Sequence, residues 1–315
     1  MAKIRRVESL KHDAYAYTKL TTMGNVLEVT TLTKEPVPPP CQKIDKDHYV
    51  DLRTGELMEF EHGETRADSV KSMRRTLAHI RALVNTNVTD AARCRWVTLT
   101  YAENMTDTER LYEDFRRFWQ RFKYWNKKEG YSQPEYITVQ EPQGRGAWHV
   151  HVFFIWPDKA PFIANNEVMA RLWGHGFTST KALKDIDNIG AYFSAYLGDM
   201  PLSDVLALPC DQMQQALAAG KVMDKQFTND QDQTKTKQFI KGGRLPLYPA
   251  GMNIVRKSKG IKLPDVECMT FEEAQKKVSS AKLTFSRSYE IVDDSGSVCN
   301  SLTKSYYNRT SQQRQ

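Results

Sequence analysis

The chain has 315 residues, of which 40% are hydrophobic and 26% are charged, as in average folded globular proteins. No stretch approaches the roughly 18 apolar residues of a membrane-spanning helix, and the N-terminus lacks the apolar segment of a secretory signal. Lys and Arg outnumber Asp and Glu by 45 to 38, and the net charge of +7 suits a polyanionic partner such as nucleic acid. The five cysteines form no C-x-x-C pair, so we expect a cytoplasmic protein without a thiolate metal site.

The first 65 residues are expected to form a β-rich leader. Turn signals at Gly24-Asn25 and Thr54-Gly55 predict two hairpins, over residues 16–32 and 48–61. The proline-rich stretch 34–42 between them favours a stiff, extended linker.

The main body is expected over residues 66–262, with a core at 93–199. Apolar residues at helical spacing predict a basic amphipathic helix over 68–87. The following elements are then expected: a strand at 94–101, a helix from about 106 to 130, a hairpin of strands 134–141 and 148–156, a helix at 164–173, a strand at 176–183 and a helix at 185–197. This order predicts an α+β fold, a central antiparallel sheet with helices packed on one face.

The sequence signal weakens after Pro201. A helix is predicted over 202–220, no element is assigned to the polar run 224–238, and residues 240–263 are rich in Gly and basic residues. Residues 263–315 are expected to be a C-terminal tail that is partly flexible. The chain has no G-x-x-x-x-G-K-[ST] match, so we expect neither a nucleotide cofactor nor an ATP-driven motor.

Two histidines carry the first candidate site. Alternation along the predicted strand 148–156 places His149 and His151 on the same face. If the preceding loop closes so that Glu141 lies opposite His149, its carboxylate points from that face as well. Two imidazoles and a carboxylate could hold a catalytic divalent cation with open positions. The alternative is a pair of histidines that only form hydrogen bonds.

Two tyrosines carry the second candidate site. Tyr192 and Tyr196 lie at i and i+4 on the flank of the predicted helix 185–197, outside its apolar stripe. Paired phenols in this position could be nucleophiles, and the alternative is that they are amphipathic edge residues. His175, between two glycines, is interpreted as a turn residue.

The succession VTLTY (97–101), WHVHVFF (148–154) and Tyr192-x-x-x-Tyr196 resembles the three motifs of the HUH endonucleases. It is most similar to the rolling-circle replication initiators of small phages, plasmids and integrated elements. The resemblance covers roughly residues 93–199.

This resemblance implies the ferredoxin- or RRM-like fold of that superfamily, with Glu141, His149 and His151 holding Mg²⁺ or Mn²⁺ and Tyr192 or Tyr196 as nucleophile. It implies a metal-dependent DNA endonuclease and strand transferase that nicks single-stranded DNA at a replication origin, leaves a 5′-phosphotyrosine and a free 3′-hydroxyl, and later rejoins the strand. It also implies a host helicase and polymerase as partners. A relaxase or transposase with the same chemistry, or a DNA-binding protein whose catalytic site has lapsed, remain alternatives.

The chain departs from the family pattern after each tyrosine. Relatives often carry a lysine three residues later, where this chain has Ala195 and Asp199. The lysines considered as substitutes are Lys181, Lys184, Lys221 and Lys241. Lys181, Lys241, Arg244 and Arg256 are the candidate DNA-binding residues, although the basic segment that holds the last three could equally be a flexible linker.

Overall fold

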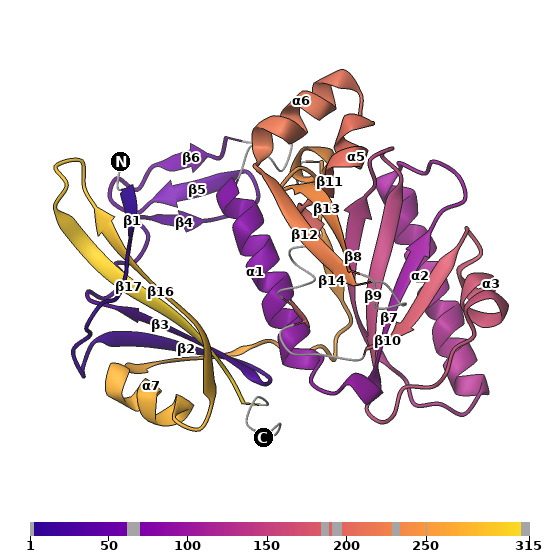
Figure 1. The fold of residues 1–315 in the computed structure, drawn as a ribbon, viewed down its shortest axis with the longest axis horizontal. Coiled ribbons are helices and arrows are strands. Elements are labelled where there is room, and N and C mark those ends of the chain that lie inside the picture. Colours follow the sequence, from indigo (N-terminus) through magenta and orange to yellow (C-terminus); the bar gives the residue numbers. More distant parts are fainter. Residues whose placement is uncertain are drawn as a thin grey trace. The chain divides into compact units, whose positions relative to one another are not determined.

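The computed structural model describes residues 3–61, 70–183, 189–190, 197–228, 234–249 and 251–309. The chain divides into two compact units. One combines Met1–His62 with Pro264–Gln315, and the other is Gly63–Leu263. Figure 1 shows the elements of each unit.

The unit 63–263 is built around a five-stranded antiparallel sheet. Its strands, in spatial order, are β10 (Thr178–Ala182), β7 (Cys94–Thr100), β9 (Trp148–Ile155), β8 (Glu135–Pro142) and β14 (Val255–Lys257). β8 and β9 form the predicted hairpin, and β7 and β10 lie beyond β9 (Figure 1). The predicted α+β class with a central antiparallel sheet is confirmed.

Helix α2 (Thr108–Lys128) covers one face of this sheet. Its N-terminus is capped by Asp107, whose side chain accepts hydrogen bonds from two backbone N–H groups of the first turn. Phe118 and Phe122 contact Phe154 of β9, with ring centroids 6.3 and 4.4 Å apart. Because side chains alternate along a strand, α2 lies on the face of β9 opposite His149 and His151.

Helix α1 (Val70–Asn87) matches the amphipathic helix predicted over 68–87. Its apolar stripe of Ile80, Leu83 and Val84 is fully buried in the core of the unit. The short turns η2 (Ala91–Arg93) and η3 (Asn165–Met169) precede β7 and α3 (Ala170–Trp173), respectively.

The region after Pro201 is more ordered than the sequence predicts. The expected helix 202–220 is two helices, α5 (Leu202–Leu206) and α6 (Cys210–Ala219), because Pro209 cannot continue a helix. The polar run 224–238 lies largely in the hairpin of β12 (Val222–Thr228) and β13 (Thr234–Ile240), which pairs with β11 (Met200–Pro201). A polar hairpin lacks the apolar alternation that would have revealed it. The turn η4 (Leu245–Leu247) follows.

The other unit contains a six-stranded sheet formed by both ends of the chain. Its strands, in spatial order, are β1 (Lys3–Val7), β16 (Lys282–Val292), β17 (Val298–Asn308), β3 (Val26–Leu32), β2 (Tyr17–Met23) and β15 (Asp265–Thr270). Helix α7 (Phe271–Val278) packs on Leu20, Leu27 and Val29. A small sheet of β4 (Cys41–Lys43), β5 (His48–Asp51) and β6 (Leu57–Glu59) completes the described part of the unit.

This arrangement corrects the expectation of a partly flexible tail at 263–315. Residues 265–308 supply three strands and a helix, and β17 pairs with β3 from the N-terminal hairpin. The predicted β-rich leader is therefore part of a larger sheet, because the edge of its hairpin is hydrogen-bonded by residues near the other end of the chain.

All five cysteines are free thiols. Among the described residues, no helix is both long enough and apolar enough to cross a membrane.

Candidate metal centre

The β8–β9 hairpin fixes the positions of the three predicted metal ligands. Glu141 of β8 pairs directly with His149 of β9, which is the register assumed in the sequence analysis. The loop closes through a hydrogen bond from Gln143 N to Ala147 O, 2.8 Å long, and Gly146 adopts φ = 83°. A left-handed backbone favours glycine here, so the tight turn and the register depend on this residue.

Glu141, His149 and His151 converge on one face of the sheet. One ligand atom from each lies within 4.8 Å of the others. Glu141 and His151 are each only 3% exposed, and His151 Nε2 is hydrogen-bonded to Glu141 Oε2, whereas His149 is half-buried. The donor set of two imidazoles and one carboxylate fits a divalent cation.

Two neighbouring side chains orient the imidazoles. Thr98 Oγ1 lies 3.2 Å from His151 Nδ1, and Gln143 Nε2 lies 3.3 Å from His149 Nδ1. A polar partner at the second ring nitrogen fixes the orientation of a histidine, as is usual for metal-binding imidazoles. The Nε2 atom of each ring is then directed to the shared site.

The protonation states also suit metal binding. Burial lowers the pKa of His149 to about 4, although the Glu141 carboxylate opposes the shift. Burial alone would raise the pKa of Glu141, but the Arg244 guanidinium and the hydrogen bond with His151 outweigh it, so this pKa is lowered overall. At neutral pH, His149 is therefore neutral and Glu141 is ionised, as metal ligands must be.

The sequence analysis missed the role of Arg244 in this cluster. Its Nη1 lies 2.7 Å from Glu141 Oε1 and donates a 2.7 Å hydrogen bond to Pro142 O. Arg244 is 6% exposed, so it is not presented to DNA, and its place is inside the site rather than on a DNA-facing surface. Its sequence context, Gly243-Arg244-Leu245, carries no signal for a contact with a strand so far away in the chain.

Arg244 also joins the metal cluster to the segment that follows the tyrosines. Its backbone N–H donates to Gly198 O at 3.2 Å, and its Nε donates to Asp199 O at 3.4 Å. The Asp199 carboxylate accepts a 3.0 Å hydrogen bond from Gly242 N. Asp199, which stands where relatives often carry lysine, thus stabilises the turn that holds Arg244.

Tyr192 and Tyr196 lie outside the described residues, but the positions that flank them are described. Gly190 N donates a 2.9 Å hydrogen bond to Asn85 Oδ1 of α1, and Ile189 is buried in the core. Leu197 is 1% exposed, and its carbonyl accepts a hydrogen bond from the Tyr248 hydroxyl. Both flanks are therefore fixed to the unit that carries the metal cluster.

The other candidate DNA-binding residues are distributed over both faces of the sheet. Lys181 is exposed on the edge strand β10, opposite Trp96, and the register places it on the face that carries His151. Lys241 is exposed in the turn after β13, and Lys184 lies outside the described residues. Arg256 lies on the other face, with its guanidinium 3.4 Å from the centroid of the Tyr112 ring of α2. The structure therefore favours Lys181 over Arg256 as a contact near the site.

Comparison with known proteins connects this site to DNA replication. Residues 94–200 match the family model of the replication-associated protein ORF2 and its relatives. The matched stretch begins at β7, ends at β11 and contains all three residues of the cluster. The match indicates a replication-initiator role. Searches of curated proteins and of solved structures found no match.

His175 lies in a turn, as predicted, and also has a partner. Its Nε2 lies 3.4 Å from Asp114 Oδ1, and the other carboxylate oxygen accepts a 3.1 Å hydrogen bond from the Tyr101 hydroxyl. Asp114 belongs to α2, so this network lies on the face opposite the metal cluster and supports the end of β7.

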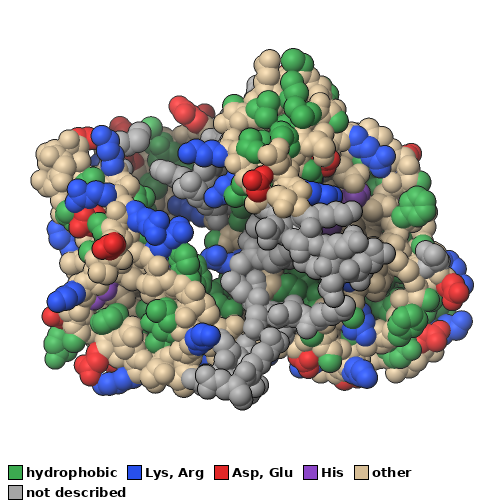
Figure 2. Space-filling model, viewed as in Figure 1, with side chains coloured by type: hydrophobic (Ala, Val, Ile, Leu, Met, Phe, Trp, Pro, Cys, Tyr) green, Lys and Arg blue, Asp and Glu red, His purple; other side chains and the backbone are tan. Residues whose placement is uncertain are grey.

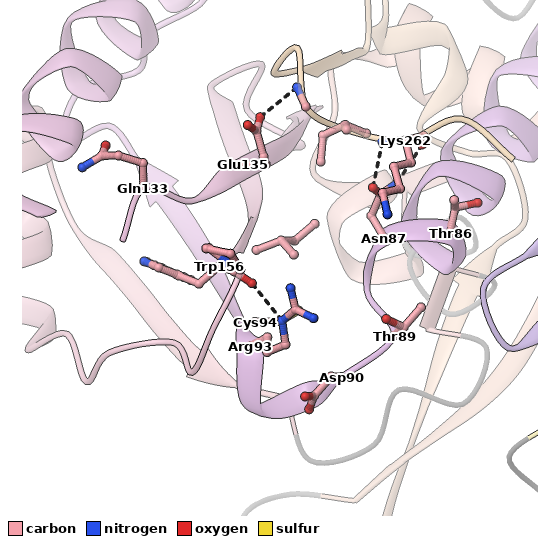
Figure 3. A pocket seen from close by; sticks show the side chains of 14 residues that line it. Thr86, Asn87, Thr89, Asp90, Arg93, Cys94, Gln133, Glu135, Trp156 and Lys262 are labelled. Atoms are coloured by element: carbon pink, nitrogen blue, oxygen red, sulfur yellow. Dashed lines mark hydrogen bonds between the residues drawn. The ribbon is translucent and has the colours of Figure 1, made fainter. Parts of the chain in front are cut away.

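A polar pocket of about 310 Å³ lies at the other end of the same sheet (Figure 3). Hydrogen bonds between Asn87 and Lys262, from Gly260 to Glu135, and from Arg93 to the Trp156 carbonyl hold its walls. Ile155 lines it, six residues along β9 from His149, so the pocket lies about 20 Å from the cluster at the strand rise of 3.3 Å per residue. It is not part of the candidate metal centre.

Proposed function

We propose that the chain is a rolling-circle replication initiator of the HUH endonuclease type, which nicks and rejoins single-stranded DNA. The observation that carries the proposal is the Glu141–His149–His151 cluster inside the stretch that matches a replication-associated family. The three-motif resemblance of the sequence supports the same chemistry and supplies the candidate nucleophiles, Tyr192 and Tyr196.

A divalent cation held by Glu141, His149 and His151 would supply Lewis-acid polarisation of the scissile phosphate. The imidazoles favour Mn²⁺ over Mg²⁺, because Mg²⁺ prefers oxygen ligands. Arg244 keeps Glu141 ionised and oriented, while Thr98 and Gln143 orient the histidines.

The proposed chemistry exchanges one phosphodiester bond for another. The phenolic oxygen of Tyr192 or Tyr196 attacks phosphorus and loses its proton, and the 3′-oxygen leaves and is protonated. The products are a 5′-phosphotyrosine and a free 3′-hydroxyl that can prime a polymerase. Attack by a 3′-hydroxyl on the phosphotyrosine reverses the exchange and rejoins DNA, so neither direction requires ATP.

The test is formation of a covalent adduct. Full-length protein is incubated with single-stranded oligonucleotides from its own genetic neighbourhood, with Mn²⁺ or EDTA and without ATP, and is analysed on denaturing gels and by intact mass. We expect a Mn²⁺-dependent adduct that maps to Tyr192 or Tyr196. Binding without an adduct, when an origin sequence is present, would instead favour a lapsed catalytic site. An adduct formed only with transfer-origin or transposon-end DNA would favour a relaxase or transposase.

A further inference from the structure

The six-stranded sheet of the unit 1–62 with 264–315 has one covered face and one open face. Leu20, Leu27 and Val29 pack on α7, and their neighbours in the register share this covered face. The alternate residues of each strand point to the opposite side, where Phe285 and Arg287 are exposed. We refer to this side, defined by Arg6, Lys19, Phe285, Arg287, Tyr289, Lys304 and Tyr306, as the open face.

Cations lie side by side on the open face. Arg287 of β16 pairs directly with Lys304 of β17, and the same row continues through Thr30 to Lys19 of β2. Like charges on directly paired strand residues destabilise a sheet. An anion bound over this row would relieve the repulsion.

Aromatic rings form the adjacent row. Phe285 pairs with Tyr306, their ring centroids are 6.0 Å apart, and Phe285 is 41% exposed. Each ring also has a cation from the neighbouring row over it: Arg287 lies 4.9 Å from the Phe285 centroid, and Lys304 lies 5.6 Å from that of Tyr306. On the other side of the cation row, Tyr289 pairs with Arg6.

The two faces of the sheet differ in charge. Among the residues that the six strands place on the open face, Glu28 is the one acid, and it is paired with Lys304 at 2.6 Å. The covered face holds Asp265, Glu267 and Glu290. Figure 2 shows Lys and Arg side chains over the part of the molecule that contains β16 and β17.

We propose that the open face is a second DNA-binding surface that takes single-stranded DNA. Surfaces that bind single strands without sequence preference combine cations that contact phosphates with aromatic rings on which bases stack. An antiparallel sheet with exposed rings presents bases in this way. The inference concerns residues outside the 94–200 stretch and does not require nicking.

The experiment measures binding by the full-length protein in EDTA, where no metal-dependent cleavage occurs. The probe for fluorescence anisotropy is a labelled oligo-dT of about 20 nucleotides, which exceeds the site size of one such surface. The variants are Phe285→Leu, Tyr306→Ala and Arg287→Gln. The matched control is Lys276→Gln, an exposed cation on α7 that pairs with Glu272 at 2.7 Å on the covered side of the sheet.

The expected results follow from the role of each side chain. Tyr306→Ala should weaken binding about tenfold, the typical effect of losing one stacked base. Phe285→Leu should also weaken it, and Phe285→Tyr should retain it, because a ring is needed rather than apolar area. Arg287→Gln should reduce the slope of log K against log salt by about 0.7, whereas Lys276→Gln should not.

A second measurement does not depend on the folding of variants. Photo-crosslinking of the unmodified protein to thymidine-rich DNA, followed by peptide mapping, should give adducts in β16 and β17. Affinities within twofold of the parent together with crosslinks confined to the unit 63–263 would overturn the proposal, as would losses restricted to duplex DNA. Since EDTA is present throughout, a failure to nick in the adduct assay leaves this outcome unaffected.

Discussion

Arg244 and Glu141 form a buried ion pair in which Nη1 and Oε1 are 2.7 Å apart and both side chains are less than 10% exposed. Glu141 is thereby held between a cation and the imidazole of His151. Arg244 also contacts the carbonyls of Gly198 and Asp199, so one residue connects the metal cluster to the segment after the tyrosines. A buried cation that both fixes a ligand and anchors the nucleophile segment is a positioning residue.

Replacing this cation should destabilise the fold and the site together. Arg244→Gln leaves the Glu141 carboxylate buried without its guanidinium, and removal of one partner of a buried pair costs about 3 kcal/mol or more. Urea denaturation should show this loss in the free energy of unfolding. The double variant Glu141→Gln with Arg244→Gln should lose less than the sum of the two single changes, and additive losses would contradict the pairing.

Removing an imidazole should abolish metal binding. His149→Ala or His151→Ala should weaken Mn²⁺ affinity in calorimetry by more than about 100-fold, since even changes in the outer shell cost roughly 10–100-fold. Metal-dependent nicking should be lost, while DNA binding in EDTA persists. His79→Ala, an imidazole change on α1 outside the cluster, is the control, and equal losses in all three variants would argue against a specific site.

Each tyrosine can be tested with minimal change. Tyr192→Phe removes only the phenolic oxygen, so the protein should fold while the covalent adduct disappears. If the adduct yield is unchanged and Tyr196→Phe abolishes it, Tyr196 is the nucleophile. Retention of the adduct in the double variant would rule out both residues.

The packing of the tyrosine segment on α1 depends on Gly190. A Cβ atom at this position would lie 2.5 Å from Arg81 O and 2.7 Å from Asn85 Oδ1, so Gly190→Ala must push the segment away from α1. We expect a loss of about 1–3 kcal/mol in thermal or urea unfolding, as for other overpacked sites, and a lower adduct yield. Gly198→Ala is the matched control, because its Cβ would meet only Leu77 Cδ1, at 3.7 Å.

The pH dependence of His149 tests the burial of the site. Its pKa of about 4 in the folded state lies below the ordinary value of 6.5, so between these values the unfolded state binds the proton first. The stabilising effect of the neutral ring is thus complete above pH 6.5 and is lost as the pH falls towards 4. NMR titration of the metal-free protein should show no His149 protonation above about pH 5. A midpoint near the ordinary value would mean that the ring is exposed to solvent.

Local sequence determined the elements that depend on short-range pattern. The amphipathic helices α1 and α2, the turn residues of the hairpins, and the alternation that puts His149 and His151 on one face could all be predicted, because each depends on residues a few positions apart. The register of Glu141 with His149 was also within reach, since a short loop constrains how two adjacent strands can pair.

Only the tertiary structure determined the contacts between distant segments. Arg244 was expected on a DNA-binding surface, yet it is buried against Glu141, because the ion pair forms only when the turn after β13 packs beside β8. Residues 265–308 were expected to be a tail, yet they complete the sheet that β2 and β3 begin, because the exposed edge of a hairpin must find hydrogen-bonding partners wherever the chain supplies them. Burial and edge pairing are properties of the assembled fold, and no local pattern records them.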